Sequence, residues 1–218
     1  MEEPTLVISE LYLSIQGEST WAGLPCTFIR LTGCPLRCSY CDTEYAFFGG
    51  QRMVLSRILS QVHELGCPLV EVTGGEPLAQ RECITLLHAL LEQGYTVLLE
   101  TSGAYSLREV PTEVHRIVDL KCPSSGEMHR NCWENISLLT LRDEVKFVVG
   151  TREDYEWARD QIHQHRLFDR CGAVLFSPVW GQLAPRELAS WLLADHLFGA
   201  RLQIQLHKVI WPTESRGV

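Results

Sequence analysis

Three cysteines, Cys34, Cys38 and Cys41, lie close together at the spacing C-x₃-C-x₂-C. Thiolates this close in sequence can wrap one small inorganic centre, and cluster iron is normally held by cysteine sulfur. Three protein ligands rather than four predict a [4Fe–4S] cluster with one iron left open for a non-protein ligand. A zinc knuckle or an ordinary group of reduced thiols is the alternative. Zinc prefers four ligands in two C-x₂-C-like pairs, and the sequence holds no second pair.

Length and charge limit the class of protein. A chain of 218 residues predicts one domain, residues 1–218, with a full core. The net charge of −8 speaks against a broad nucleic-acid surface. No apolar run reaches the length of a membrane span, and the acidic start at residues 1–4 is unlike a signal peptide. We therefore expect a cytoplasmic protein that binds neither nucleic acid nor membrane and keeps its cysteines reduced.

The elements that must position the cysteine loop, residues 33–50, follow an alternating pattern. After a first strand at 6–15, strand, loop and helix repeat roughly six times, before a polar tail at 207–218. Strands are expected at 26–31, 69–72, 95–99, 116–120, 144–149, 173–176 and 201–206, and helices at 53–65, 81–93, 132–140, 151–168 and 185–197. Thr151 is expected to cap its helix, with Asp154 reaching back. Such units build a parallel sheet with helices outside, and the chain is too short for eight of them. The predicted α/β fold is an incomplete, open (β/α)₆ barrel.

The unusual motifs fall just after the predicted strands. They are the cysteine loop, TGGEP (73–77), ETSG (100–103), KCPSSG (121–126), SPVW (177–180) and the segment 205–207. Because ligand sites gather at the carboxyl ends of parallel strands, we expect these segments to ring one mouth. Gly, Pro and Ser could instead merely mark turns, but the turns before the strands are plainer.

The cysteine motif and the later TGGEP resemble the signature of the radical S-adenosylmethionine (SAM) superfamily. The stretches LSIQGES, FIRLTGC and CDTEYAF, with the tail QLHKVIWPTESRGV, resemble the 7-carboxy-7-deazaguanine synthase family over most of the chain. The resemblance implies a carbon–nitrogen lyase of 7-deazapurine or queuosine biosynthesis. It would convert 6-carboxy-5,6,7,8-tetrahydropterin to 7-carboxy-7-deazaguanine with loss of ammonia. A 5′-deoxyadenosyl radical would take hydrogen from C6 of the pterin, and SAM would be regenerated.

The resemblance also implies roles for individual residues. The three cysteines would ligate the cluster, and Thr43, ahead of its neighbour Asp42, would ligate Mg²⁺. Arg30 would hold the substrate carboxylate, for which a planar bidentate donor is suited. The residues implied to contact SAM are Tyr40, Gly74, Gly75, Glu76, Ser102, Pro123, Ser124 and Ser125. Those implied to contact the pterin are Ile15, Gln16, Gly17, Glu18, Arg30, Thr73 and His207, with Glu18 on its guanidine-like face.

Other interpretations stay open at this point. Arg30 could be an ion-pair partner of Glu18, Thr43 could cap a turn, and His207 could be structural. The chain could also be another small radical SAM enzyme, such as a glycyl-radical activase, or a metal-binding module that uses its cysteines only to fold. The resemblance further implies a flavodoxin or ferredoxin as electron donor and a homodimer, with Trp180 and Trp211 in lid or dimer packing. The sequence assigns no role to residues 212–218.

Overall fold

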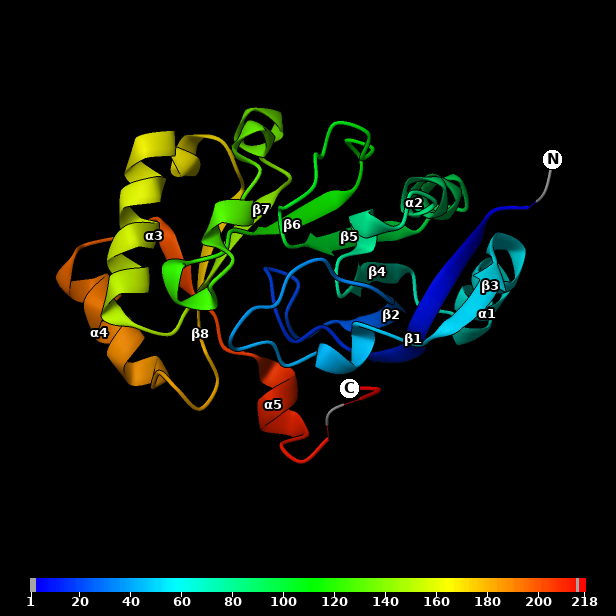
Figure 1. The fold of residues 1–218 in the computed structure, drawn as a ribbon, viewed down its shortest axis with the longest axis horizontal. Coiled ribbons are helices and arrows are strands. Elements are labelled where there is room, and N and C mark those ends of the chain that lie inside the picture. Colours follow the sequence, from blue (N-terminus) through cyan, green and yellow to red (C-terminus); the bar gives the residue numbers. More distant parts are fainter. Residues whose placement is uncertain (1–2, 215) are drawn as a thin grey trace.

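The computed structural model describes residues 3–214 and 216–218, so three residues of the predicted domain, Met1, Glu2 and Ser215, lie outside it. Within the described residues one sheet has the strand order β3-β1-β2-β4-β5-β6-β7-β8-β9 (Figure 1). The strands are β1 (Thr5–Ile15), β2 (Pro25–Leu31), β3 (Gln51–Val54), β4 (Leu69–Gly74), β5 (Thr96–Thr101), β6 (His115–Asp119), β7 (Glu144–Val149), β8 (Ala173–Pro178) and β9 (Ala200–Leu202).

The sheet is parallel from β2 to β9, while β1 pairs antiparallel with both β2 and β3. β3 and β9 are its two edges, and they do not pair with each other, so the sheet stays open. Its central strands are buried on both faces, as parallel strands covered by crossovers should be. The predicted incomplete barrel is therefore confirmed.

The α-helices are α1 (Leu55–Leu65), α2 (Cys83–Glu92), α3 (Arg152–His165), α4 (Pro185–Ala194) and α5 (Leu206–Ile210). α1 buries Ile58 and Val62 along one stripe and ends at Gly66, whose left-handed backbone suits a residue without Cβ. α3 begins with the predicted capping box between Thr151 and Asp154. α1 and α2 cover one end of the sheet, and α3 and α4 cover the other (Figure 1).

Three sequence expectations for these elements were wrong. The helix expected at 132–140 is a 3₁₀-helix, Trp133–Leu138, because Asn135 bonds to the backbone of Leu107, Gly103 and Tyr105 and ties the segment to the preceding loop. The first residues of the helix expected at 53–65 belong instead to β3, where Met53 pairs with β1. The last strand ends at Leu202 rather than 206, and the polar tail begins with α5.

The strand register gathers polar residues on the inner face of the sheet. Arg30 on β2 lies beside Thr73 on β4, and Asp119 on β6 lies beside Lys146 on β7. Because side chains alternate along a strand, Glu71 and Glu100 fall on this same face. Farther from the carboxyl ends that face is apolar, with Phe28, Leu98 and Ile117 among its buried residues. The opposite face packs on the helices and carries the larger core.

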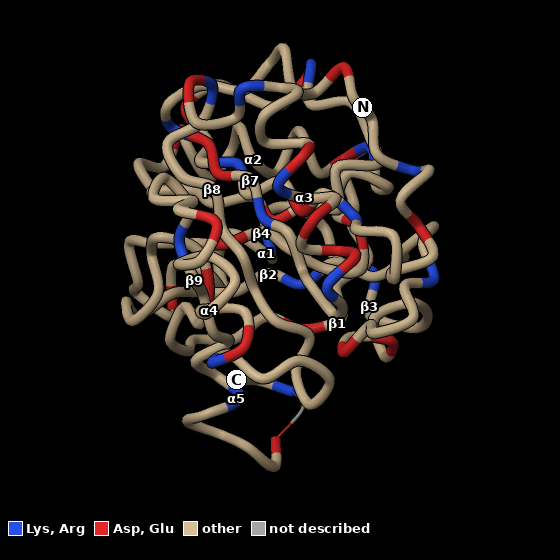
Figure 2. The backbone as a smooth tube through the Cα atoms, turned by 90° about the vertical axis from the view of Figure 1, so that its left-hand side faces the viewer, with Lys and Arg blue, Asp and Glu red and all other residues tan. Residues whose placement is uncertain are grey.

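Charged residues of both signs are interspersed along the backbone in the view of Figure 2. None of the helices in the described part of the chain is both long and apolar enough to cross a membrane.

Candidate active site

A cavity of about 490 Å³ opens at the carboxyl ends of the parallel strands. Its walls include residues from all six motif segments, so the expectation of a single mouth is confirmed. The sequence-predicted residues that line it are Ile15, Gln16, Gly17, Glu18, Arg30, Cys34, Cys38, Tyr40, Cys41, Thr43, Thr73, Gly74, Gly75, Ser102 and His207. Four others, Glu76, Pro123, Ser124 and Ser125, are not among the residues that line it.

The thiols of Cys34, Cys38 and Cys41 are free and half-buried at one side of the cavity. Burial raises the pKa of all three, that of Cys38 to about 11, so binding iron must displace protons. Among residues 3–214 and 216–218, no three Cys, His, Asp or Glu side chains converge on a single metal ion. Cluster cysteines bind separate irons and stand farther apart than the ligands of one zinc ion. Three free thiols at one side of the cavity fit the set of ligands that a cluster with one open iron would need.

Gly74 and Gly75 bring the end of β4 against the cysteine loop. A Cβ on Gly75 would lie 2.6 Å from the carbonyl oxygen of Gly33 and 2.7 Å from the Cβ of Cys34. A Cβ on Gly74 would lie 2.5 Å from the carbonyl oxygen of Leu31. Only residues without Cβ permit this approach, so the backbone of the TGGEP segment forms the wall next to the cluster thiols.

Glu76 supports this wall from behind. Its carboxylate is fully buried and accepts hydrogen bonds from the Ser102 N–H at 2.7 Å and the Thr101 hydroxyl at 2.9 Å. Burial raises its pKa, and the hydrogen bonds oppose that rise. Glu76 therefore joins the loop after β4 to the loop after β5 and places Ser102 in the cavity.

Arg30 lies on the other side of the cavity, half-buried on β2. Its Nη2 donates to the Tyr12 hydroxyl at 3.1 Å, and its Nε lies 3.7 Å from a Glu10 carboxylate oxygen. Among the described residues, that buried Nε has no hydrogen-bond partner. The ion pair considered from sequence, between Arg30 and Glu18, is not formed. Arg30 thus keeps donor capacity for an anion in the cavity.

Sequence reasoning missed the partner of Glu18, which is Lys146. The Lys146 ammonium lies 2.9 Å from Glu18 and also pairs with Glu100. Gln203 and Gln205 donate to the Glu18 carboxylate at 3.1 and 3.0 Å. Burial works to raise the Glu18 pKa, but Lys146 and the bond from Gln205 outweigh it and leave the pKa lowered. Glu18 is therefore a fixed, ionised acceptor.

Glu71, which lines the same cavity, has a pKa that is shifted in the opposite direction to that of Glu18. It is buried on β4 and accepts a hydrogen bond from Gln16. Burial, with the negative charges of Glu100 and Glu18, raises its pKa well above the ordinary value. The cavity thus holds two carboxyl groups whose pKa values shift in opposite directions, downward for Glu18 and upward for Glu71. Such a pairing is of the kind that separates acid from base in active sites.

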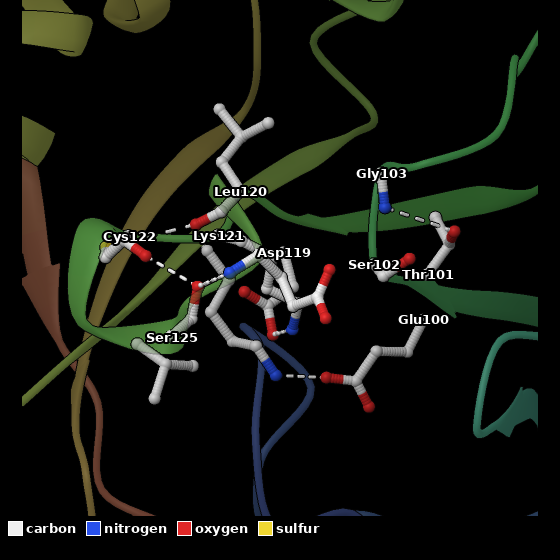
Figure 3. Close-up of polar contacts among 12 residues, drawn as sticks. Glu100, Thr101, Ser102, Gly103, Asp119, Leu120, Lys121, Cys122 and Ser125 are labelled. Carbon is white, nitrogen blue, oxygen red and sulfur yellow. Dashed lines mark hydrogen bonds and ion pairs between the residues drawn. The ribbon is translucent and has the colours of Figure 1, made fainter. Parts of the chain in front are cut away.

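Asp119 and Lys121, also missed from sequence, follow β6 beside the thiols. Their ion pair measures 2.8 Å, and Figure 3 shows them next to Glu100 and Ser102 at the end of β5. Burial lowers the Lys121 pKa, but Asp119 and Cys38 outweigh it and raise the pKa overall. Lys121 therefore remains a cation whose field favours thiolate over thiol at the cysteines.

Thr43 and the tail complete the mouth. The Thr43 hydroxyl donates to Asp42 at 2.9 Å, and Asp42 pairs with Lys208 of α5 at 2.5 Å. His207 packs closely on Gly17, whose Cβ would lie 2.6 Å from the imidazole Nδ1. Trp180 and Trp211 also line the cavity. The tail therefore closes one side of the site. Of its residues, the sequence predicted a binding role only for His207.

These residues fit the cofactors of one class of enzymes. The radical SAM superfamily profile matches residues 28–164, a span that holds the cysteine loop, TGGEP and the loop after β6. The chain belongs to the radical SAM superfamily. Its cofactors are accordingly a [4Fe–4S] cluster and SAM, and the three thiols and the glycine wall suit them.

Two relatives narrow the class further. The 7-carboxy-7-deazaguanine synthase of Koribacter versatilis is 46% identical over 225 residues, covering 97% of this chain and 99% of the relative. The 7-carboxy-7-deazaguanine synthase of Chlorobaculum tepidum is 48% identical over 219 residues, covering 99% of this chain and 99% of the relative. The chain is thus a member of the 7-carboxy-7-deazaguanine synthase family.

A solved structure shares the fold. The crystal structure of QueE from Escherichia coli superposes with a TM-score of 0.75, over 92% of this chain and 94% of that one, at 23% identity.

Proposed function

We propose that this protein converts 6-carboxy-5,6,7,8-tetrahydropterin to 7-carboxy-7-deazaguanine and ammonia. The observation that carries the proposal is that one cavity joins the thiols of Cys34, Cys38 and Cys41 to Arg30 and to the carboxyl groups of Glu18 and Glu71. Its volume of about 490 Å³ lies within the usual range for small-molecule sites. Substrate and product differ by one molecule of ammonia, so the reaction has no net oxidation for the protein to drive.

The loaded cluster and SAM supply a 5′-deoxyadenosyl radical, and the protein's own residues place the substrate near it. Arg30 holds the substrate carboxylate with its unused donors. Glu18, kept ionised by Lys146, accepts N–H groups from the guanidine-like face of the pterin. Thr73 and Gln16 border the same space. On the cofactor side, Tyr40, Ser102 and the backbone of Gly74 and Gly75 receive SAM.

Mg²⁺ would bind beside Thr43. Its hydroxyl, together with waters and a substrate oxygen, suits an ion that keeps much of its water shell. Asp42 lies next to Thr43 but already pairs with Lys208. A direct Asp42 ligand would have to break that pair, which favours Thr43 as the protein ligand.

Electron supply would come from a flavodoxin or ferredoxin in the cytoplasm. Arg37, exposed on the outer side of the cysteine loop, stacks over Phe47 at 4.2 Å beside the exposed Phe48. A cation next to an aromatic surface, close to the cluster thiols, is suited to an acidic redox partner.

The protein would also form a homodimer. Large apolar side chains are exposed on and around α4, β9 and α5, and include Leu193, Phe198, Leu202, Val209 and Ile210. β9 additionally leaves one edge unpaired within the described sheet. Such a surface is typical of an association face.

The test is an anaerobic assay of reconstituted protein with SAM, reductant, Mg²⁺ and 6-carboxytetrahydropterin, read by mass spectrometry. We expect 7-carboxy-7-deazaguanine to form over many turnovers without stoichiometric loss of SAM. If 5′-deoxyadenosine forms without any deazapurine, the proposed cluster chemistry stands but the proposed substrate is wrong. In that case Thr43→Ala should leave Mg²⁺ dependence unchanged, as expected of an activase.

A further inference from the structure

The turn around Cys38 is held from outside by one distant segment, residues 123–127. The Ser39 N–H donates to the carbonyl oxygen of Ser125 at 3.0 Å, and the Ser39 hydroxyl donates to the carbonyl oxygen of Ser124 at 2.7 Å. On the other side of Cys38, the Arg37 N–H donates to the Glu127 carboxylate at 2.7 Å. The residues flanking the central cysteine thus owe much of their backbone placement to this segment.

The segment 123–127 is braced by hydrogen bonds of its own. Ser125 is fully buried, and its hydroxyl donates to the carbonyl oxygen of Cys122 at 2.6 Å (Figure 3). The same hydroxyl accepts from the Glu127 N–H at 3.0 Å. Gly126 completes the turn with a left-handed backbone, φ 77°. These bonds make the segment a preformed support rather than a loop that adapts to the cysteines.

Asp154, fully buried at the start of α3, fixes the support to the rest of the fold. Its Oδ1 accepts from the Ser124 N–H at 2.8 Å, and its Oδ2 accepts from the Ser124 hydroxyl at 2.5 Å. Oδ2 also accepts from the Gly150 and Thr151 N–H groups at 2.9 and 3.0 Å. A capping box needs only the bond to Thr151. The two bonds to Ser124 therefore do something that helix capping does not.

These contacts also account for Ser124, whose hydroxyl and N–H are directed at Asp154 and which does not line the cavity. Asp154 is linked through Ser124 to Ser39, and through Ser39 to the turn that carries Cys38. Two hydrogen-bonded steps separate the buried carboxylate from the cluster loop. Hydrogen bonds to a buried charged group are the strong ones, which suits a fixed anchor.

We propose that Asp154 is a positioning residue for the iron–sulfur cluster, acting through Ser124 and Ser39 on the placement of Cys38. The inference rests on the proposed function only in taking the cysteines to hold a cluster. Asp154 does not line the cavity. It is required for retention of the cluster, apart from its role in capping α3.

The test compares Asp154→Asn and Ser124→Ala with the matched control Thr151→Ala. Thr151→Ala removes the other half of the capping box, the hydroxyl that accepts from the Asp154 N–H at 3.1 Å, and leaves the Ser124 bonds in place. After anaerobic reconstitution, iron loss to a chelator is followed at fixed temperature. Asp154→Asn and Ser124→Ala should lose iron faster than wild type, Asp154→Asn by roughly tenfold, and Thr151→Ala at the wild-type rate.

Hydrogen exchange of the cluster-free proteins measures, without any metal, how firmly the segment 123–127 holds the turn around Cys38. The amides of Arg37 and Ser39 should exchange faster in Asp154→Asn and Ser124→Ala, and not in Thr151→Ala. Equal iron loss or equal exchange in Thr151→Ala and Asp154→Asn would overturn the proposal, because capping would then explain both. Wild-type-like behaviour of Asp154→Asn would overturn it as well. If wild type binds no cluster, the proposed function fails and the exchange result alone decides the role of Asp154.

Discussion

Arg30 is held by neighbours that leave part of its guanidinium unused. Tyr12 accepts from Nη2, while Nε has no hydrogen-bond partner among the residues described. Lysine in its place would keep the charge but lose the planar fork that binds a carboxylate at two points.

Arg30→Lys should therefore raise KM for the carboxypterin roughly 10- to 100-fold, with a smaller change in kcat. Steady-state kinetics measure this directly. Arg52→Lys, at an exposed arginine that bonds to Thr5 on the outer part of the sheet, is the control and should leave KM unchanged. An unchanged KM in Arg30→Lys would show that the substrate carboxylate lies elsewhere.

Burial and the neighbouring carboxylates raise the pKa of Glu71, so ionisation of its carboxyl group works against folding. Its raised pKa means that the folded protein retains a proton that the unfolded chain releases above about pH 4.5. Stability linked to this group is therefore full below that pH and falls as pH rises toward the folded pKa.

Glu71→Gln, which keeps the shape and the neutral state, should unfold at a higher temperature than wild type at pH 8. The gain should be about 1 kcal/mol or more and should shrink toward pH 5. Thermal unfolding of the cluster-free proteins measures it, with Glu113→Gln as an exposed control. A variant less stable than wild type at pH 8 would contradict the assigned ionisation.

The sequence was sufficient to find the residues that belong to motifs, such as the three cysteines and Arg30. It did not reveal Glu71 or Lys146, which lie in apolar strand sequences, Val70-Glu71-Val72 and Val145-Lys146-Phe147. A charged residue between apolar strand residues can be detected in the sequence, and it indicates a buried charge that needs a partner. The identity of the partner depends on strand register, which the sequence does not state.

At the scale of elements, the end of β4 and the cysteine loop fit together only because Gly75 has no side chain. Gly75→Ala would place a Cβ 2.6 Å from the Gly33 carbonyl oxygen and 2.7 Å from the Cβ of Cys34. The loop would have to move, and the thiol of Cys34 with it.

Gly75→Ala should therefore reconstitute with less than about half of the wild-type iron and sulfide, by analogy with the cost of overpacking a rigid contact. Gly172→Ala is the control, because its Cβ would meet the Leu141 carbonyl oxygen at 2.4 Å, away from the cavity. It should lower the melting temperature but reconstitute fully. Equal loss of cluster in both variants would indicate general destabilisation.

Elements with strong local signals were predicted and those set by tertiary contacts were not. The apolar stripe of α1 and the capping box of α3 can be recognised in the sequence. β3 is four residues long and exists because it pairs with β1, and α5 forms where the tail folds back over the cavity. Elements this short contain too few residues to show a helical or strand periodicity in the sequence.

At the scale of the whole molecule, the end of the sheet near β9 carries the apolar surface proposed for dimerisation. Phe198 is 79% exposed and Leu193 is 69% exposed. Phe198→Glu would place a charge in that proposed interface.

Phe198→Glu should convert the dimer to monomer at micromolar concentration without changing the melting temperature of the cluster-free monomer by more than a few degrees. Sedimentation equilibrium measures the mass. Phe48→Glu, at an aromatic residue 75% exposed beside the cysteine loop, is the control and should remain dimeric. A monomeric wild type, or a Phe198→Glu variant that remains dimeric, would place the interface elsewhere or remove it.

The strand order also sets the order in which the molecule can be assembled. From β4 onward each strand pairs with the strand made next, so this part of the sheet can grow while the chain leaves the ribosome. The cysteines are synthesised early, but the turn around Cys38 is bonded to the much later Ser124, Ser125 and Glu127. Ser124 is in turn bonded to Asp154, which is made later still. A nascent chain therefore has its three cysteines long before it has the segment that supports the turn around Cys38, and we expect cluster loading to follow the synthesis of α3.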